Sequence, residues 1–367
     1  MKVVIITNIP APYRVKVFEK LANFVDLSVI FCARGESNRS WKLPKFNFRH
    51  IFLKENFVER KSKDTFVQTY VHNNFDVFFE LRKLKPDIVI TSGFNPTHIY
   101  AFIWAKLNRS KHICMTDGTV DSESGLTYLH NLIRKVVFFG SHAFIAASEG
   151  GIKLYKSFSI STASIFKSQL CANNNIFFKK TPFKSRNFDV LFSGQFQERK
   201  MPFLFAEICN LLVEKRGKCK ALLIGDGPLR EDLLRSLSQK GVDFHYAGFV
   251  DQDSLPNYYS ASKVLLFTTR MDAWGVVANE AMAAGTPVIT SPFAGVANEL
   301  VINNVTGAVC ELKAQVWCNA VERLLDDPNY WLNCSNNARN LVATYNYENA
   351  AKGIISACRF SLRKRDF

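Results

Sequence analysis

The sequence lacks the run of roughly 18 apolar residues that a membrane-spanning helix needs, and stretches such as residues 136–139 are far shorter. The apolar run at residues 3–7 is also too short for the core of a signal peptide, so we expect the chain to stay in the cytoplasm. No zinc finger, basic zipper or RNP-type stretch is present, which argues against a nucleic-acid partner. What remains is an ordinary globular composition, with 47% hydrophobic and 22% charged residues.

The cysteines and histidines form no pattern typical of metal ligands. The nine cysteines are scattered and never form a C-x-x-C pair, and the seven histidines show neither H-E-x-x-H nor H-x-H spacing. We interpret the cysteines as reduced core residues and expect no metal site. An Asp-x-Asp at 251–253 precedes a predicted helix, and we interpret it as a cap of that helix.

Acidic residues are scarce in the first half of the chain. Residues 1–187 hold 28 Lys and Arg against 13 Asp and Glu, whereas residues 188–367 hold 19 of each, so the first half carries the whole net charge of +15. A basic surface attracts phosphate-rich molecules or an anionic membrane face. Phenylalanine is interspersed with these bases, as at 41–46 and 56–63, which suits a peripheral membrane face. A basic solvated surface is the alternative, and the sequence leaves both open.

Short apolar runs alternate with segments of helical period, which is typical of parallel sheets covered by helices on both faces. At about 150 residues per domain, 367 residues predict two such α/β domains. In the first half, strands are predicted at 3–7, 27–32, 88–91, 113–116 and 143–147, and helices at 14–23, 66–84, 97–107 and 126–139. Residues 33–62 are predicted as a long excursion with one strand.

Turn-forming residues at 171–187 predict a linker, after which the alternation restarts. In the second half, strands are predicted at 190–193, 221–224, 244–247, 264–267 and 288–290, with helices beginning near Met201, Pro228, Leu255, Val276 and Val296. A last helix is predicted at about 347–365, where terminal cations suit a helix C-terminus.

Ligands of open parallel sheets bind beyond the carboxyl ends of the strands, so the loops there are the first candidates for a site. After the first strand of the second domain, Gly194 is followed by Arg199 and Lys200 at a helix start, which indicates either a phosphate site or a solvated helix start. The next loop holds Gly225 and Gly227, but Arg230 replaces the third glycine of a dinucleotide fingerprint. The NAD-binding pattern therefore fails.

The loop after the predicted strand at 264–267 is the richest. It presents Asp272, then Gly275 at the start of a helix whose first free amides belong to Val276 and Val277, and then Glu280 one turn further on. Such a layout offers amides to a diphosphate and two carboxylates to sugar hydroxyls. A buried structural glutamate is the alternative for Glu280.

Residues 194–307 resemble the nucleotide-binding domain of the family 4 retaining glycosyltransferases. The matching motifs are the segments 225–231, 247–250, 280–288 and 304–307 and the spacing from Asp272 to Glu280, which follows a Glu-x7-Glu pattern. The first half matches more loosely, through residues 6–14.

The resemblance implies an α/β GT-B fold, in which two doubly wound Rossmann-like domains face each other across a cleft. It places an acceptor-binding domain at 1–180, a nucleotide-sugar-binding domain at 188–345, and a C-terminal helix at 346–367 that packs back on the first domain.

Carried over residue by residue, the resemblance implies that Glu280 binds the ribose, Asp272 the donor sugar and Lys200 the diphosphate. The implied donor-binding set is Gly194, Gln195, Arg199, Lys200, Gly225, Gly227, Gly248, Phe249, Val250, Asp272, Trp274, Gly275, Val276, Val277 and Glu280. Two positions depart from the family: Asp272 replaces the usual glutamate, and Gln195 replaces the usual phosphate-binding arginine. Glutamine carries no charge, and we hypothesise that Arg199 compensates for it.

In the first domain, Asp117 follows the predicted strand at 113–116, near the place where related enzymes have a histidine that approaches the donor sugar. A structural Asp turn before Gly118 is the alternative. The segments 12–14, 93–96 and 148–150 follow other strands of this domain and are expected to line the acceptor side. Asp117 therefore joins Asp272, Glu280 and Lys200 as the candidate catalytic residues.

The sequence thus predicts a retaining, metal-independent glycosyltransferase of hexosyl or related groups. It would move a sugar from a nucleoside-diphosphate sugar to a glycan or lipid-linked acceptor in surface polysaccharide synthesis, without a cofactor. The basic first half would hold an anionic membrane surface or an acidic glycan. A glycoside hydrolase that uses Asp272 and Glu280 is one alternative. The other is a non-catalytic nucleotide-sugar-binding scaffold of a polysaccharide assembly complex, which Gln195 would allow.

Overall fold

The computed structural model describes residues 1–37, 43–61 and 68–363. Within these ranges the chain forms two compact units: unit 1 comprises Met1–Leu170 and Tyr347–Phe367, and unit 2 comprises Cys171–Asn346. Part of each aromatic and basic stretch predicted at 41–46 and 56–63 lies outside the described residues, as do the last cations of the final helix. No helix in the described ranges is long and apolar enough to cross a bilayer.

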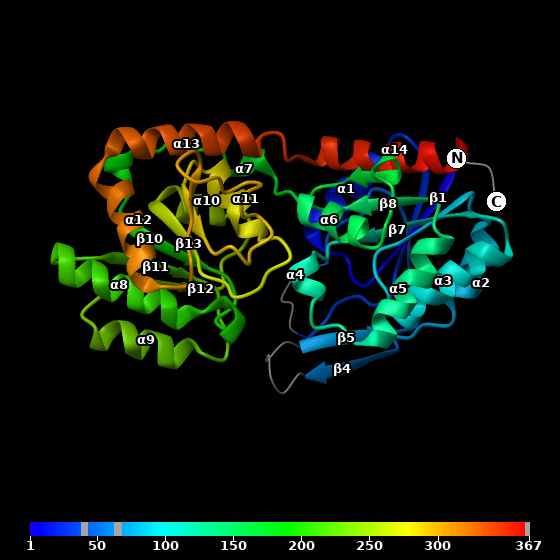
Figure 1. Ribbon diagram of the computed structural model, residues 1–367, viewed down its shortest axis with the longest axis horizontal. Helices are drawn as coiled ribbons and strands as arrows, with labels where there is room; N and C mark the ends of the chain where they lie inside the picture. The colour runs from blue at the N-terminus through cyan, green and yellow to red at the C-terminus, as the bar shows by residue number, and fades with distance from the viewer. Residues whose placement is uncertain (38–42, 62–67, 364–367) are drawn as a thin grey trace. The chain divides into compact units, whose positions relative to one another are not determined.

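Unit 1 is built on a seven-stranded parallel sheet in the order β3-β2-β1-β6-β7-β8-β9, with a separate antiparallel β4–β5 ribbon (Figure 1). Its strands are β1 Lys2–Thr7, β2 Asp26–Phe31, β3 Arg49–Phe52, β4 Phe57–Lys61, β5 Gln68–His72, β6 Ile88–Thr91, β7 Lys111–Thr116, β8 Ala143–Ala146 and β9 Ile165–Lys167. Its helices are α1 Pro12–Ala22, α2 Val77–Leu84, α3 Pro96–Leu107, α4 Val120–Glu123, α5 Tyr128–Gly140, α6 Glu149–Ser157 and α14 Tyr347–Arg363. The central strands are buried from end to end because helices cover the sheet.

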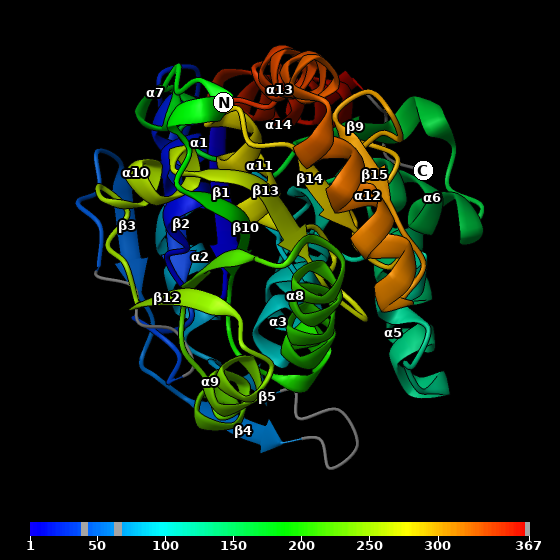
Figure 2. The ribbon, with the colours of Figure 1, turned by 90° about the vertical axis from the view of Figure 1, so that its left-hand side faces the viewer.

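Unit 2 is built on a six-stranded parallel sheet in the order β12-β11-β10-β13-β14-β15. Its strands are β10 Phe188–Ser193, β11 Lys220–Ile224, β12 Asp243–Gly248, β13 Ser262–Phe267, β14 Val288–Thr290 and β15 Gly307–Val309. Its helices are α7 Asn174–Phe177, α8 Pro202–Arg216, α9 Arg230–Gln239, α10 Leu255–Ser260, α11 Val276–Ala283, α12 Ala314–Asp326 and α13 Pro328–Val342, with a short 3-10 turn, η3, at Glu198–Lys200. Helices α8, α9 and α12 lie together over one side of this sheet (Figure 2).

The two-domain α/β prediction is confirmed, since both units are parallel sheets with covering helices. The nine cysteines are all buried and none forms a disulfide. Helix α14 follows unit 2 in the sequence but packs on α1 and on strands β7, β8 and β9 of unit 1. Residues 171–187, predicted as a linker, belong to unit 2, where α7 contacts α10 and α11.

Two predicted helices are wrong. Residues 68–72 form strand β5, and the helix begins only at Val77, because residues 68–72 pair with strand β4 and the local pattern does not reveal this pairing. Buried Asn74 lies between β5 and α2, and its side chain donates to the carbonyls of Cys32 at 3.1 Å and Lys54 at 2.7 Å. Near Val296 the chain forms turns and isolated bridges instead of a helix.

Candidate functional site

The carboxyl ends of the unit 2 strands are joined by backbone hydrogen bonds between their loops. The amide of Gly194 donates to Ile224 at 3.0 Å, and that of Gly225 donates to Gly248 at 2.8 Å. A Cβ at Gly225 would lie 2.0 Å from the Gly194 carbonyl oxygen, and one at Gly227 would lie 2.4 Å from that of Phe196. Side chains are therefore excluded at both positions by loop packing, and this packing places the candidate residues next to one another.

Asp272 lies at the centre of a charged cluster in unit 2. One of its carboxylate oxygens is 2.5 Å from the Lys200 ammonium and 3.2 Å from the Arg199 guanidinium, and the other accepts the Trp274 amide at 3.1 Å. Burial by itself raises the pKa of Asp272, but the two cations and the hydrogen bonds outweigh it and lower this pKa to about 2. Asp272 is therefore an anion at physiological pH, and its carboxylate oxygens can only accept hydrogen bonds.

The two cations are fixed by the loop that carries Asp272. The hydroxyls of Thr268 and Thr269 donate to the carbonyls of Lys200 and Arg199 at 2.9 and 3.0 Å, respectively. The Lys200 ammonium also lies 4.5 Å from the centre of the Phe267 ring. The η3 turn is thereby attached to the end of β13, so the charges are in place before any ligand is added.

The N-terminus of α11 lies directly after this cluster. Gly275 precedes the helix with a φ of 109°, and a Cβ there would lie 2.3 Å from the Phe267 ring, so only glycine fits. The first amides of a helix have no partner inside it, and here they belong to Val276 and Val277, which are half-buried. Amides and dipole together favour an anion at this position.

Glu280 is buried in α11 and is held by a tyrosine. The Tyr259 hydroxyl donates to its carboxylate at 2.7 Å and lies 2.9 Å from the Ser193 hydroxyl. Burial raises the pKa of Glu280 to about 7, although the Tyr259 hydrogen bond acts in the opposite direction. Sequence reasoning missed Tyr259 and Ser193, because nothing in the local pattern distinguishes them from ordinary core or loop residues.

The side chains of the remaining predicted donor-binding residues differ in how accessible they are. Gln195 accepts a hydrogen bond from the side chain of Gln197 at 2.8 Å, and Phe249 is 62% exposed beside half-buried Val250. The Trp274 ring is buried, stacks on Tyr345 and donates to Asn279 at 2.8 Å. Trp274 therefore reaches Asp272 through its backbone amide, whereas Phe249 has a ring face available for stacking.

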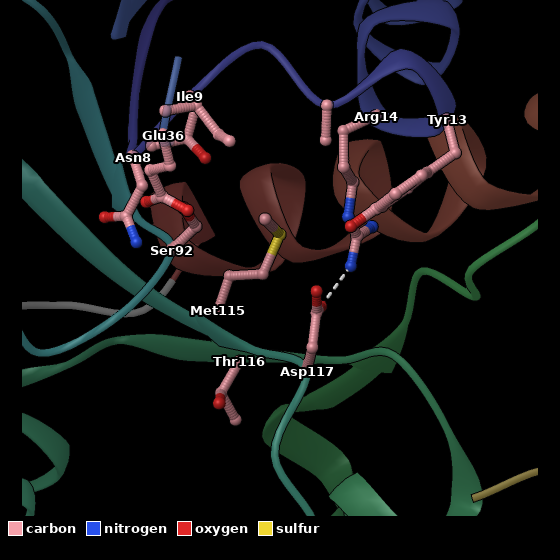
Figure 3. Close-up of a pocket in the computed structure, with 11 residues that line it drawn as sticks. Asn8, Ile9, Tyr13, Arg14, Glu36, Ser92, Met115, Thr116 and Asp117 are labelled. Carbon is pink, nitrogen blue, oxygen red and sulfur yellow. Dashed lines mark hydrogen bonds and ion pairs between the residues drawn. The ribbon is translucent and has the colours of Figure 1, made fainter. Parts of the chain in front are cut away.

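Unit 1 has a pocket at the carboxyl ends of β1, β6 and β7, in which Arg14 and Asp117 point toward each other (Figure 3). They form an ion pair, and the Arg14 guanidinium also donates to the Ser168 carbonyl at 3.3 Å. Tyr13 and Glu36 line the same pocket, and a carboxylate oxygen of Glu36 lies 3.1 Å from Nε2 of the buried His72 imidazole. Asp117, predicted from the sequence, is thus half-exposed at a polar pocket and held by a buried arginine.

The other predicted acceptor-side segments of unit 1 have structural partners. Ser148 caps α6 by accepting the Gly151 amide at 3.0 Å, and Glu149 pairs with Lys167 at 3.0 Å. The ring of His98 is buried under Gly93, and burial lowers the pKa of His98 to about 3. His98 is therefore a neutral, buried packing residue.

Two parallel-sheet Rossmann-like units in one chain are the architecture of the GT-B class of glycosyltransferase folds. The chain is similar in structure to Anabaena HepE in complex with UDP, with a TM-score of 0.76 and 14% identity over 98% of this chain and 100% of that one. It is also similar to sucrose-phosphate synthase from Thermosynechococcus elongatus, with a TM-score of 0.73 and 17% identity over 99% of both chains. The fold predicted from the sequence is confirmed.

Residues 173–341 match the family model of the glycosyl transferases group 1, so the chain carries a domain of this family. It is 29% identical over 157 residues to the alpha-D-kanosaminyltransferase of Streptomyces kanamyceticus, a match to 42% of this chain and 40% of that protein. It is 28% identical over 149 residues to the D-inositol 3-phosphate glycosyltransferase of an Arthrobacter species. This match covers 38% of this chain and 35% of that protein. The chain thus spans less than half the length of these relatives.

Proposed function

We propose that this chain is a family 4 retaining glycosyltransferase that moves a sugar from a nucleoside-diphosphate sugar to a hydroxyl of a glycan or lipid-linked acceptor, as in surface polysaccharide synthesis. The observation that carries the proposal is the fixed cluster of Asp272, Lys200 and Arg199 beside the N-terminus of α11. A group 1 domain and a neighbour bound to UDP support the same conclusion.

The donor is bound by groups that complement its charge and its hydroxyls. Lys200, Arg199 and the amides of Val276 and Val277 bind the diphosphate, while ionised Asp272 accepts hydroxyls of the donor sugar. Glu280 accepts the ribose hydroxyls, and Phe249 stacks on the base. Arg199 contributes the charge that Gln195 does not, because its guanidinium lies in the same cluster as Lys200.

The reaction breaks the bond between the anomeric carbon and the diphosphate oxygen and forms one from that carbon to the acceptor oxygen. We propose that the leaving diphosphate takes the acceptor proton on the same face of the sugar, so configuration is retained. Lys200, Arg199 and the helix amides stabilise the charge that develops on the diphosphate, and we therefore propose that no metal ion is needed. The protein contributes placement and charge stabilisation.

The acceptor is proposed to bind in the unit 1 pocket. Asp117 and Glu36 accept hydrogen bonds from hydroxyls, while Tyr13 and Arg14 donate, so the pocket suits a polyol or sugar. The Arg14 ion pair fixes the Asp117 carboxylate toward the pocket. This assigns donor and acceptor recognition to different units.

Thermal shift with UDP-, GDP-, ADP- and dTDP-sugars tests the donor site, because a ligand that binds only the folded state raises the melting temperature. One of these donors should stabilise the protein, and Glu280→Gln should abolish the shift. Glu207→Gln, on an exposed side chain of α8, is the matched control and should keep the thermal shift.

A radiolabelled form of the stabilising donor then reports sugar transfer, with and without a chelator. Binding without transfer to any acceptor would favour the scaffold, and sugar release from simple glycosides without nucleotide would favour a hydrolase.

A further inference from the structure

Helix α5 of unit 1 has an apolar face that no described residue of the same unit covers. Successive residues of a helix turn by about 100°, so positions 128, 129, 132, 136 and 139 fall on one side of α5. They are Tyr128 (82% exposed), Leu129, Leu132, Val136 and Phe139 (95% exposed). The opposite side of α5 holds Val137 and Phe138, which are buried in the core of unit 1. The helix is therefore apolar toward the core and apolar again toward solvent.

The apolar face continues on the neighbouring helix α3. The Lys106 ammonium donates to the Gly140 carbonyl at 3.2 Å, which joins the C-terminal ends of α3 and α5. Ile103 and Leu107, one turn apart on α3, are exposed as well, and Leu107 is 75% exposed. Helices α2, α3 and α5 lie in a row in Figure 1. We call the seven residues Ile103, Leu107, Tyr128, Leu129, Leu132, Val136 and Phe139 the α3–α5 face.

The charged residues carried by helices α3 and α5 are all basic. Neither α3 nor α5 contains an aspartate or glutamate, whereas Lys106 and Lys135 lie exposed on them and exposed Arg109 follows α3. Arg134 is buried and paired with Glu123 at 2.6 Å, so that acidic residue is already neutralised. Unit 1 as a whole holds 29 Lys and Arg against 15 Asp and Glu, a net charge of +14. An acidic surface is the electrostatic complement of this arrangement.

We propose that the α3–α5 face docks unit 1 on an anionic membrane surface. Apolar and aromatic side chains beside lysines and arginines match the interface of a bilayer, where rings and alkyl groups enter the headgroup layer and cations contact acidic lipid. An acidic polysaccharide would be complementary to the cations only and would leave the seven apolar side chains in water. The proposal goes beyond the proposed function by naming the surface and its partner, and it does not depend on transfer activity.

The test is sedimentation of the full chain with mixed phosphatidylglycerol–phosphatidylcholine vesicles and with pure phosphatidylcholine vesicles. The protein should bind the mixed vesicles, and binding should weaken with salt because exposed charges are screened. Leu132→Ser with Phe139→Ser should reduce the bound fraction by about tenfold or more, since two membrane-entering side chains are lost. Leu332→Ser, on a 49% exposed leucine of α13 in unit 2, is the matched control and should bind as the unmodified chain does.

The unfolding temperature of the double variant, followed by circular dichroism, should stay close to that of the unmodified chain, because Phe139 is 95% and Leu132 45% exposed. Unaltered vesicle binding by the folded double variant would overturn the proposal. Binding to a soluble acidic polysaccharide without binding to vesicles would overturn it too, as would a dimer of the unmodified chain that the double variant dissociates. A failed donor screen would leave these results standing, so the two proposals can fail separately.

Discussion

The two units share an architecture but differ in where they place positive charge. Unit 1 has a net charge of +14, whereas unit 2 has 18 Lys and Arg against 17 Asp and Glu, a net charge of +1. Unit 2 nevertheless concentrates Lys200 and Arg199 on one carboxylate at its strand ends. A site for a small anion needs a few fixed charges, while a broad basic surface suits an extended acidic partner.

The strongest test of this contrast removes the central cation of unit 2. Lys200→Met should lower kcat/KM for sugar transfer by about 10²–10³-fold, because a preorganised charge on the leaving group is lost. Steady-state kinetics with the identified donor measures the effect. Lys218→Met, an exposed lysine of the same unit, should behave as the unmodified protein. A small effect at Lys200 would mean that the charge cluster does not serve the reaction.

The second test measures how the stability of the protein depends on pH through Glu280, a buried carboxyl group in the proposed donor site of unit 2. Unfolded Glu280 ionises near its ordinary pKa of 4.5, whereas the folded protein keeps this proton to about pH 7 because the side chain is buried. Stability therefore falls as pH rises from about 4.5 to 7. Glu280→Gln should remove this pH-dependent loss of unfolding free energy, which is at most about 3 kcal/mol. Its gain in Tm over the unmodified protein should be larger at pH 8 than at pH 5.

Glu207→Gln should show no such pH-dependent gain, because its side chain is exposed. An equal change in Tm for Glu280→Gln at both pH values would contradict the assignment of a buried, protonated carboxyl group.

The third test moves to unit 1. Asp117→Asn removes the carboxylate that pairs with buried Arg14, and a hydrogen bond to a charged group contributes about 2 kcal/mol, or roughly thirtyfold. We expect a higher acceptor KM and an unchanged donor-induced thermal shift. Asp121→Asn, four residues away and exposed, is the control. If Asp117→Asn weakened donor binding as strongly as acceptor use, the division of labour between the units would be wrong.

The smallest effect is expected at Arg199. Arg199→Ala should weaken donor binding by about tenfold, because one of two cations beside Asp272 is lost while Lys200 remains. Isothermal titration with the donor measures it. Arg235→Ala on α9, which pairs with exposed Asp232, provides the control. Unchanged affinity would remove the idea that Arg199 replaces the charge missing at Gln195.

The sequence predicted the parts of this structure that depend on local pattern. Strands β6 and β14 match their predicted bounds, because each is a continuous buried apolar run. Strand β5 was missed because its residues are extended only through pairing with β4. The paired residues of β4 lie seven or more positions earlier in the sequence, across a segment of mixed composition. Asp272 and Glu280 could be found from their spacing, whereas Tyr259 could not, since only the fold brings its hydroxyl to Glu280.

Helix α14 crosses back from the end of unit 2 to pack on α1 of unit 1, where Lys20 and Glu348 pair at 2.6 Å. Unit 2 is thus an uninterrupted insertion within unit 1, which is assembled from two separate stretches of chain. During synthesis, unit 2 has all its residues available before unit 1 can complete its packing, so its folding can precede that of its host. To express unit 2 alone, the chain must be truncated at both ends, after residue 170 and before residue 347. To express unit 1 alone, residue 170 must be connected to residue 347 by a new peptide link.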